Sequence, residues 1–164
     1  MKSDIILVGN GSSLLNKVNK ELIDSYKTVV RFNSYKINGF EKYVGTKTDI
    51  WFTVNKHHFD HIKHYNKVIT HSWAKTNCQL YNSFKLERDD VEKVNYEIID
   101  EIPVSYPSTG LIAVYYFNKK VDLIGFDWWD NNKHHYGDNE LRGTLHKPHL
   151  EYKVIKSLDI NIIS

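Results

Sequence analysis

Short apolar, β-branched runs alternate along this chain with longer amphipathic runs, and few folds accommodate that alternation. It is typical of βα units, in which helices cover the faces of a parallel sheet. The sequence therefore predicts an α/β three-layer sandwich with a mostly parallel sheet of about seven strands. We expect the strands at Asp4–Gly9, Thr28–Asn33, Thr48–Thr53, Lys67–His71, Tyr96–Asp100, Val121–Phe126 and Ile160–Ser164.

The first helix is expected to begin at Ser12 or Ser13. Leu14, Val18 and Leu22 recur every four residues, which places them on one face of a helix.

Two further helices are indicated in the second half of the chain. The segment Ser108–Asn118 is apolar almost all round, so we expect it to lie against the sheet. Another helix opens at Pro148, because proline is favoured at the first helical position, and it carries Leu150, Val154 and Leu158 in register.

Three segments remain without a firm secondary-structure prediction. Asn55–His64 has a helix-like pattern, whereas Asn77–Lys93 is polar and fits no periodic pattern. Gly125–Gly143 reads as a long loop, and loops of that length in compact domains are usually functional or mobile.

Length and composition restrict the class of protein. The 164 residues correspond to one domain spanning 1–164, and 22 Lys and Arg against 20 Asp and Glu give a net charge of +2. This balance lacks the positive excess of nucleic-acid-binding proteins. The single cysteine, Cys78, excludes an intrachain disulfide, and no apolar stretch reaches the length of a membrane span. We therefore expect a cytoplasmic protein that makes at most peripheral membrane contact.

The first candidate binding element is the turn after the first predicted strand, residues 8–13 (VGNGSS). Backbone N–H groups around Gly11 and at a helix N-terminus are suited to bind a phosphate. Leu14 stands at the third glycine position of a dinucleotide fingerprint, so that fingerprint is excluded. A glycine-assisted turn without a ligand is the alternative. Asn33 ends the second strand, so Asn10 and Asn33 would lie in one crevice if these strands are neighbours.

A second strand-to-helix turn, residues 106–110 (YPSTG), repeats this arrangement with a capping hydroxyl and a glycine. Taken alone, it is a well-capped helix. Two helix N-termini at one sheet edge would form an anion site that needs no metal.

Eight of the nine histidines fall into two groups. A solvated helix face is expected for the first, which comprises His57, His58, His61 and His64. The second comprises His134, His135, His146 and His149, in the long loop and around Pro148. The positive end of a helix disfavours imidazolium, so a histidine just before the Pro148 helix is expected to be neutral, as a general base must be.

In order along the chain, these segments resemble the four motifs of animal-type sialyltransferases, glycosyltransferase family 29. Residues 8–11 (VGNG), 23–24 (ID), 29–33 (VVRFN) and 39–48 (GFEKYVGTKT) resemble the large motif. Residues 106–110 (YPSTG) through 121–126 (VDLIGF) resemble the small motif. Residues 135–138 (HYGD) resemble the third motif, and His146 with Glu151 the very small one.

The resemblance implies a Rossmann-like, GT-A-type scaffold and an inverting transfer of sialic acid from CMP-sialic acid, with no cofactor or metal. It implies that Asn10 and Asn33 hold the CMP phosphate and ribose, and that Tyr106 hydrogen-bonds the phosphate. His146 would be the catalytic base, and His135 would assist the departing phosphate.

The remaining implied contacts come from the small motif. Ser108, Thr109 and Gly110 would contact the nucleotide and the sugar carboxylate. Gly125 would let the chain pass close to cytidine.

The chain also departs from the family in three respects. It lacks the cysteine pair that joins the large and small motifs, it is much shorter, and it is expected to lack a signal anchor. These differences lead us to expect a bacterial or viral cytoplasmic version. Its expected partners are a CMP-sugar donor and a glycan or glycolipid acceptor. Kdo is an alternative donor sugar, and a CMP-sugar hydrolase or a CMP-binding module is the alternative function.

Overall fold

A single sheet of seven strands organises the computed structural model, which describes residues 3–54, 65–72, 88–128, 136 and 146–164. The strand order is β5-β4-β3-β2-β1-β6-β7, and every neighbouring pair is parallel. The predicted α/β fold is therefore confirmed. The strands are β1 (Ile5–Val8), β2 (Thr28–Phe32), β3 (Ile50–Thr53), β4 (Lys67–Thr70), β5 (Val91–Lys93), β6 (Asp122–Ile124) and β7 (Asn161–Ile163).

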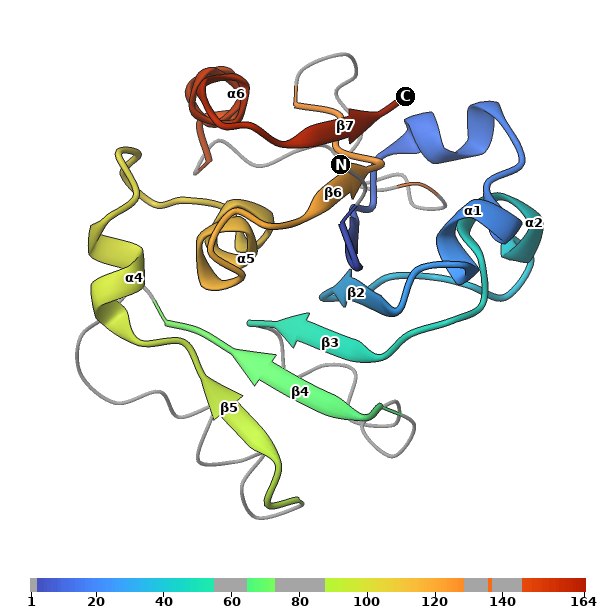
Figure 1. The fold of residues 1–164 in the computed structure, drawn as a ribbon, viewed down its shortest axis with the longest axis horizontal. Helices are drawn as coiled ribbons and strands as arrows, with labels where there is room; N and C mark the ends of the chain where they lie inside the picture. The colour runs from blue at the N-terminus through green and yellow to red at the C-terminus, as the bar shows by residue number, and fades with distance from the viewer. Residues whose placement is uncertain (1–2, 55–64, 73–87, 129–135, 137–145) are drawn as a thin grey trace.

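Helices cover both faces of the sheet, which makes three layers (Figure 1). One face is covered by α4 (Tyr96–Asp100), α5 (Thr109–Tyr116) and α6 (Pro148–Ser157). The other carries the 3-10 helix η1 (Ser12–Asn16), α1 (Lys20–Asp24) and α2 (Glu41–Val44).

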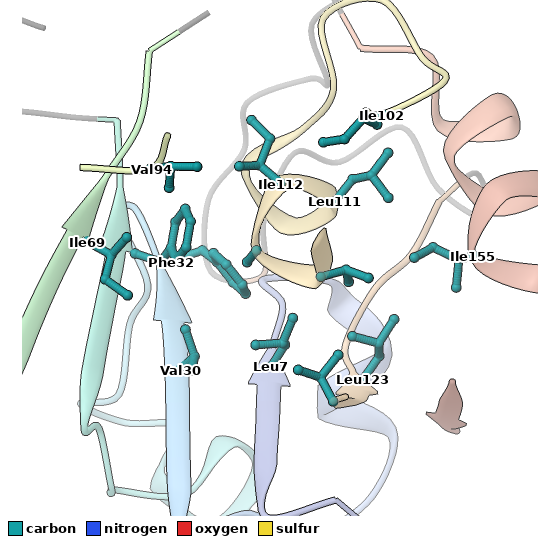
Figure 2. Packing of buried hydrophobic residues seen from close by; sticks show 14 of the residues in the cluster. Leu7, Val30, Phe32, Ile69, Val94, Ile102, Leu111, Ile112, Leu123 and Ile155 are labelled. Atoms are coloured by element: carbon teal, nitrogen blue, oxygen red, sulfur yellow. The ribbon is translucent and has the colours of Figure 1, made fainter. Parts of the chain in front are cut away.

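The alternation of side chains along the strands divides the core between the two faces. In β1, Leu7 belongs to the cluster under α5, whereas Ile6 and Val8 belong to the cluster under η1 and α1. Figure 2 shows Leu111 and Ile112 of α5 above the strand side chains of the first cluster. Burying one such aliphatic side chain stabilises the fold by roughly 1.5–3 kcal/mol, so α5 is anchored firmly over the centre of the sheet.

A buried arginine ties the second strand to α2. Arg31 is 0% exposed; its Nε donates to the Lys47 carbonyl oxygen and the Thr48 hydroxyl, and its Nη2 donates to the Val44 carbonyl oxygen. These acceptors compensate a charge that would otherwise be expensive to bury. Burial lowers the pKa of Arg31 from its usual value.

The expected helix from Ser12 or Ser13 through Leu22 is wrong as a single element. It is interrupted between η1 and α1, and Val18 is 65% exposed. The side chain of buried Asn19 explains the break, since its Nδ2 donates to the carbonyl oxygens of Leu14 and Lys17. Such side-chain bonds compete with the helical ones.

The strand predicted at Tyr96–Asp100 is also wrong. This segment is α4, whose N-cap Asn95 accepts a hydrogen bond from the Glu97 N–H. The two adjacent isoleucines favoured a strand, but the cap favours a helix. The seventh strand is instead β5, within the segment Asn77–Lys93 that gave no clear pattern.

The other expected elements lie close to their predicted positions. Ser108 caps α5, and Pro148 opens α6 as its first residue. Residues 55–64, 73–87, 129–135 and 137–145 lie outside the described residues, so the helix-like segment and most of the long loop have no structural account. No helix in the described part of the chain is long and apolar enough to cross a membrane.

Candidate functional site

The topology identifies one edge of the sheet as the place for a binding site. From β1 the chain adds strands in one direction as far as β5, and it then returns to place β6 on the other side of β1. In open parallel sheets, ligands bind at the carboxyl ends of the strands where the order reverses in this way. Here that point lies between the loops that follow β1 and β6.

The glycines of these two loops are explained by close backbone packing. The Gly9 N–H donates to the Ile124 carbonyl oxygen and the Gly11 N–H to that of Gly125, each at 2.8 Å. A Cβ on Gly11 would lie 2.6 Å from the Gly125 carbonyl oxygen. Gly125 has a φ of +72°, and a Cβ there would lie 2.6 Å from Leu14 Cγ. The N–H of Gly11 is therefore already bonded within the chain.

Asn10 and Asn33 follow the neighbouring strands β1 and β2, as the sequence led us to expect. Asn10 Nδ2 donates to the Phe32 carbonyl oxygen at 3.1 Å, while its Oδ1 is buried and accepts no bond from any described residue. Asn33 has a φ of 46°. Its Oδ1 accepts from the Val54 N–H at 3.0 Å and from the Thr53 hydroxyl at 3.3 Å, and its Nδ2 makes no hydrogen bond within the described residues. One acceptor and one donor, at the ends of the neighbouring strands β1 and β2, thus make no hydrogen bond within the described residues.

The N-terminus of α5 binds a carboxylate of the chain itself. Glu151 of α6 is 2% exposed; its Oε1 accepts from the Ser108 N–H at 2.8 Å, and its Oε2 from the Ser108 hydroxyl at 2.5 Å. The same hydroxyl accepts from the Leu111 N–H at 3.2 Å. Ser108 therefore uses both of its donors in holding α6 against α5.

The N-terminus of η1 is occupied in the same manner. Asp127, which follows β6, accepts from the Ser13 N–H at 2.9 Å and from the Ser12 hydroxyl at 3.3 Å. We expected two open helix N-termini that would together bind an external anion. Instead, a carboxylate of the protein itself binds N–H and hydroxyl groups at each N-terminus: Asp127 at η1 and Glu151 at α5. Each carboxylate compensates part of the positive charge of the helix dipole.

The remaining donors at the start of α5 belong to Thr109 and Gly110. Their backbone N–H groups make no hydrogen bond within the described residues, as is usual in the first turn of a helix. Gly110 packs tightly, because a Cβ there would lie 2.5 Å from Phe126 Cε1. Thr109 is 6% exposed, and its hydroxyl lies 3.1 Å from His71 Nε2.

His71 follows β4 and is 2% exposed. Burial, together with the nearby His146, lowers the pKa of His71 to about 3. Its ring is therefore neutral at physiological pH, and one ring nitrogen carries the proton.

His146 lies just before α6, close to the start of α5. Its Nδ1 lies 3.0 Å from the carbonyl oxygen of Tyr106. A carbonyl oxygen can only accept, so Nδ1 is the protonated nitrogen, and in the neutral ring Nε2 carries the lone pair. Tyr106 is 57% exposed with a φ of 54°, a sparsely populated conformation for this residue type. It also borders a cavity of about 440 Å³ with Tyr96 and Asp100.

The structure brings together most of the residues predicted for the site. Asn10, Asn33, Ser108, Thr109 and the loop at Gly125 all follow carboxyl ends of strands or begin α5. His135 lies outside the described residues, as do His57, His58, His61, His64 and His134.

Sequence reasoning missed His71 and Asp127. His71 is the last residue of the strand predicted at Lys67–His71, and Asp127 directly follows the strand predicted at Val121–Phe126. A polar residue at the carboxyl end of a parallel strand is the signal that selected Asn33, and applied to every strand it would also have selected these two.

Comparison with known proteins identifies the family. The model of the family described as "Glycosyltransferase family 29 (sialyltransferase)" matches residues 5–89, slightly more than half of the chain. The chain belongs to glycosyltransferase family 29. The matched segment runs from β1 past β4, so it contains the glycine turn, Asn10, Asn33 and His71.

Two curated relatives of this family 29 chain match different lengths of it. The human "CMP-N-acetylneuraminate-beta-1,4-galactoside alpha-2,3-sialyltransferase" is 52% identical over 48 residues, which are 29% of this chain and 13% of the relative. The "Beta-1,6-galactosyltransferase GALT29A" of Arabidopsis thaliana is 25% identical over 93% of this chain and 50% of its own length. The family 29 chain thus spans half or less of these relatives.

Solved structures agree on the fold. A mammalian sialyltransferase superposes with a TM-score of 0.74 at 20% identity, covering 99% of this chain and 69% of that one. A mammalian sialyltransferase in complex with Gal-beta-1-3GalNAc-ortho-nitrophenol gives a TM-score of 0.70 at 21% identity. The family 29 chain therefore has the Rossmann-like fold of these enzymes.

Proposed function

We propose that this chain is a CMP-sugar-dependent glycosyltransferase that transfers sialic acid, or a related acidic sugar such as Kdo, to a glycan or glycolipid hydroxyl with inversion. The acceptor oxygen bonds to the anomeric carbon, and the bond from that carbon to the phosphate oxygen breaks. CMP leaves with the electron pair, and the acceptor proton passes to a base. Family membership and the fold support this reaction class.

The observation that carries the proposal is the hydrogen bond between His146 and the Tyr106 carbonyl oxygen. It fixes the tautomer in which Nε2 can accept a proton, and it anchors the ring beside the start of α5. General-base catalysis needs a nitrogen with an available lone pair at a fixed position. We therefore propose His146 as the base, as the family's very small motif implies. His135 is proposed to assist the departing phosphate.

The donor is proposed to bind across β1, β2 and α5. The buried Oδ1 of Asn10 would accept a bond from a ribose or cytosine donor, and the Nδ2 of Asn33 would donate to the ribose or phosphate. The N–H groups of Thr109 and Gly110 would bind an oxyanion of the donor. Ser108 would support this site through Glu151.

Metal independence and a cytoplasmic location are further parts of the proposal. The carboxylates at the starts of η1 and α5, Asp127 and Glu151, are bonded to N–H and hydroxyl groups of the protein. Uncharged N–H and O–H groups of the protein would then stabilise the negative charge on CMP, without a resident cofactor.

The test is product analysis with CMP-sialic acid, with and without saccharide acceptors. We expect His146→Ala to lower transfer by about 10²–10⁴-fold, the usual contribution of a general base, with CMP affinity nearly unchanged. His149→Ala is the matched control, because His149 is an exposed residue of the adjoining α6. If the His146→Ala variant transferred sugar at the wild-type rate, His146 would be excluded as the base.

The Arabidopsis relative supports a second candidate, transfer of galactose from a nucleotide-activated donor, because that relative matches nearly the whole chain. Competition among CMP-sialic acid, CMP-Kdo and UDP-galactose distinguishes these donors. Release of free sugar without transfer to any acceptor would instead indicate a CMP-sugar hydrolase, and binding without turnover a CMP-binding module.

A further inference from the structure

We propose that His71 is a positioning residue that orients the Thr109 hydroxyl so that its proton is donated to an oxyanion of the bound donor. This inference rests on the proposed function, since it concerns the same donor site. His71 would act through the Thr109 hydroxyl and would not itself touch the donor. Sequence motifs did not point to it.

Two hydroxyl groups, those of Ser108 and Thr109, lie at the start of α5. Ser108 donates its hydroxyl proton to Glu151 and accepts from the Leu111 N–H, so this hydroxyl is committed to the fold. The Thr109 hydroxyl takes no part in that cap. Its nearest polar partner in the described part of the chain is His71 Nε2, at 3.1 Å.

The direction of this hydrogen bond decides what Thr109 can do. If Nε2–H donates to the hydroxyl oxygen, the hydroxyl proton points elsewhere and is available to a ligand. If Nε2 instead accepts the hydrogen bond, the Thr109 hydroxyl proton points toward His71 and cannot be donated to a ligand. A threonine hydroxyl has a single proton, so only the first arrangement adds the Thr109 O–H to the two unbonded N–H groups of Thr109 and Gly110 as a possible donor to a ligand.

The surroundings of His71 support a dedicated polar role. The residue is 2% exposed, and its ring centroid lies 6.0 Å from that of Phe52 on β3. A phenyl ring would suit this environment without the cost of burying an imidazole. Burial keeps the ring neutral, so it donates through one nitrogen only and adds no positive charge of its own.

The experiment compares CMP with cytidine, because only CMP carries the phosphate. We would measure both affinities by calorimetry for the wild type, His71→Phe, His71→Gln, Thr109→Val and the double variant His71→Phe/Thr109→Val. His71→Phe removes the donor but keeps the ring volume. His71→Gln retains an N–H at a similar reach and is the matched control.

We expect His71→Phe to weaken CMP binding by about five- to tenfold, as for the loss of roughly one net hydrogen bond, while cytidine affinity is unchanged. His71→Gln should bind CMP nearly as the wild type does. The double variant should bind no more weakly than Thr109→Val. Unchanged CMP affinity in His71→Phe, or an equal loss for CMP and cytidine, would overturn the proposal.

Two further outcomes separate this inference from the proposed function. If the wild type binds no CMP, the proposed function fails and this inference fails with it. If the wild type binds CMP and His71→Phe binds it equally well, only the role of His71 fails. The ¹⁵N shifts of the His71 ring test the bond directly: the Nε2–H tautomer is expected, and the Nδ1–H tautomer would overturn the proposal.

Discussion

Acid should destabilise this protein through His71 before most of its carboxylates titrate. The usual pKa of histidine is 6.5, and burial, with the nearby His146, lowers that of His71 to about 3. The unfolded chain therefore binds a proton that the folded protein excludes. The free energy of unfolding is therefore unaffected by His71 well above pH 6.5, and it decreases as the pH falls from 6.5 toward 3.

The magnitude follows from proton linkage. Each pH unit well below 6.5 costs about 1.4 kcal/mol for one excluded proton. Between pH 7 and pH 4.5 the loss from His71 is then roughly 2–3 kcal/mol, a large share of the stability of an ordinary domain.

Urea denaturation at both pH values measures this loss for the wild type and for His71→Gln. The variant has no titrating group at position 71, so other titrations cancel in the difference between the two proteins. We expect the wild type to lose about 2–3 kcal/mol more than the variant. An equal pH dependence of the two unfolding free energies would refute the reasoning.

Three substitutions test the contacts that support the site, each by urea denaturation. Arg31→Leu should cost roughly 3 kcal/mol or more, because buried carbonyl oxygens lose their donor; a cost under about 1 kcal/mol would show that these bonds contribute little. Glu151→Ala should cost about 3–5 kcal/mol, whereas Glu151→Gln, which keeps one acceptor, should cost clearly less. Equal costs would contradict the role of the carboxylate. Gly125→Ala should cost about 2–4 kcal/mol from its positive φ and the contact with Leu14, and a neutral effect would mean that the loop relaxes easily.

The sequence predicted the sheet well because a parallel sheet buried on both faces leaves a strong local pattern. The apolar runs that became β1, β2, β4 and β6 are bounded by polar residues or glycine, so their positions could be predicted closely. The predictions failed where a single polar side chain decides the outcome. Asn19 breaks the first helix, and Asn95 turns an isoleucine-rich segment into α4.

The site was predictable where it follows strands and not where it depends on tertiary contacts. Asn10 and Asn33 could be paired, because consecutive strands of such a sheet are often neighbours. The contact of Glu151 with Ser108 joins two helices that are distant in sequence. The contact of His71 with Thr109 depends on the start of α5 lying beside the residue that follows β4, which no local pattern encodes.

The central claim is that the carboxyl edge of this sheet binds CMP without a metal, and thermal unfolding with and without CMP tests it most directly. CMP at about 100 times its Kd should stabilise the protein by about 2.7 kcal/mol, which raises the Tm by roughly 5–10 °C for a chain of this size. The shift should persist in EDTA and should shrink in Asn33→Ala. No shift at millimolar CMP would contradict the nucleotide site, and its abolition by EDTA would contradict metal independence.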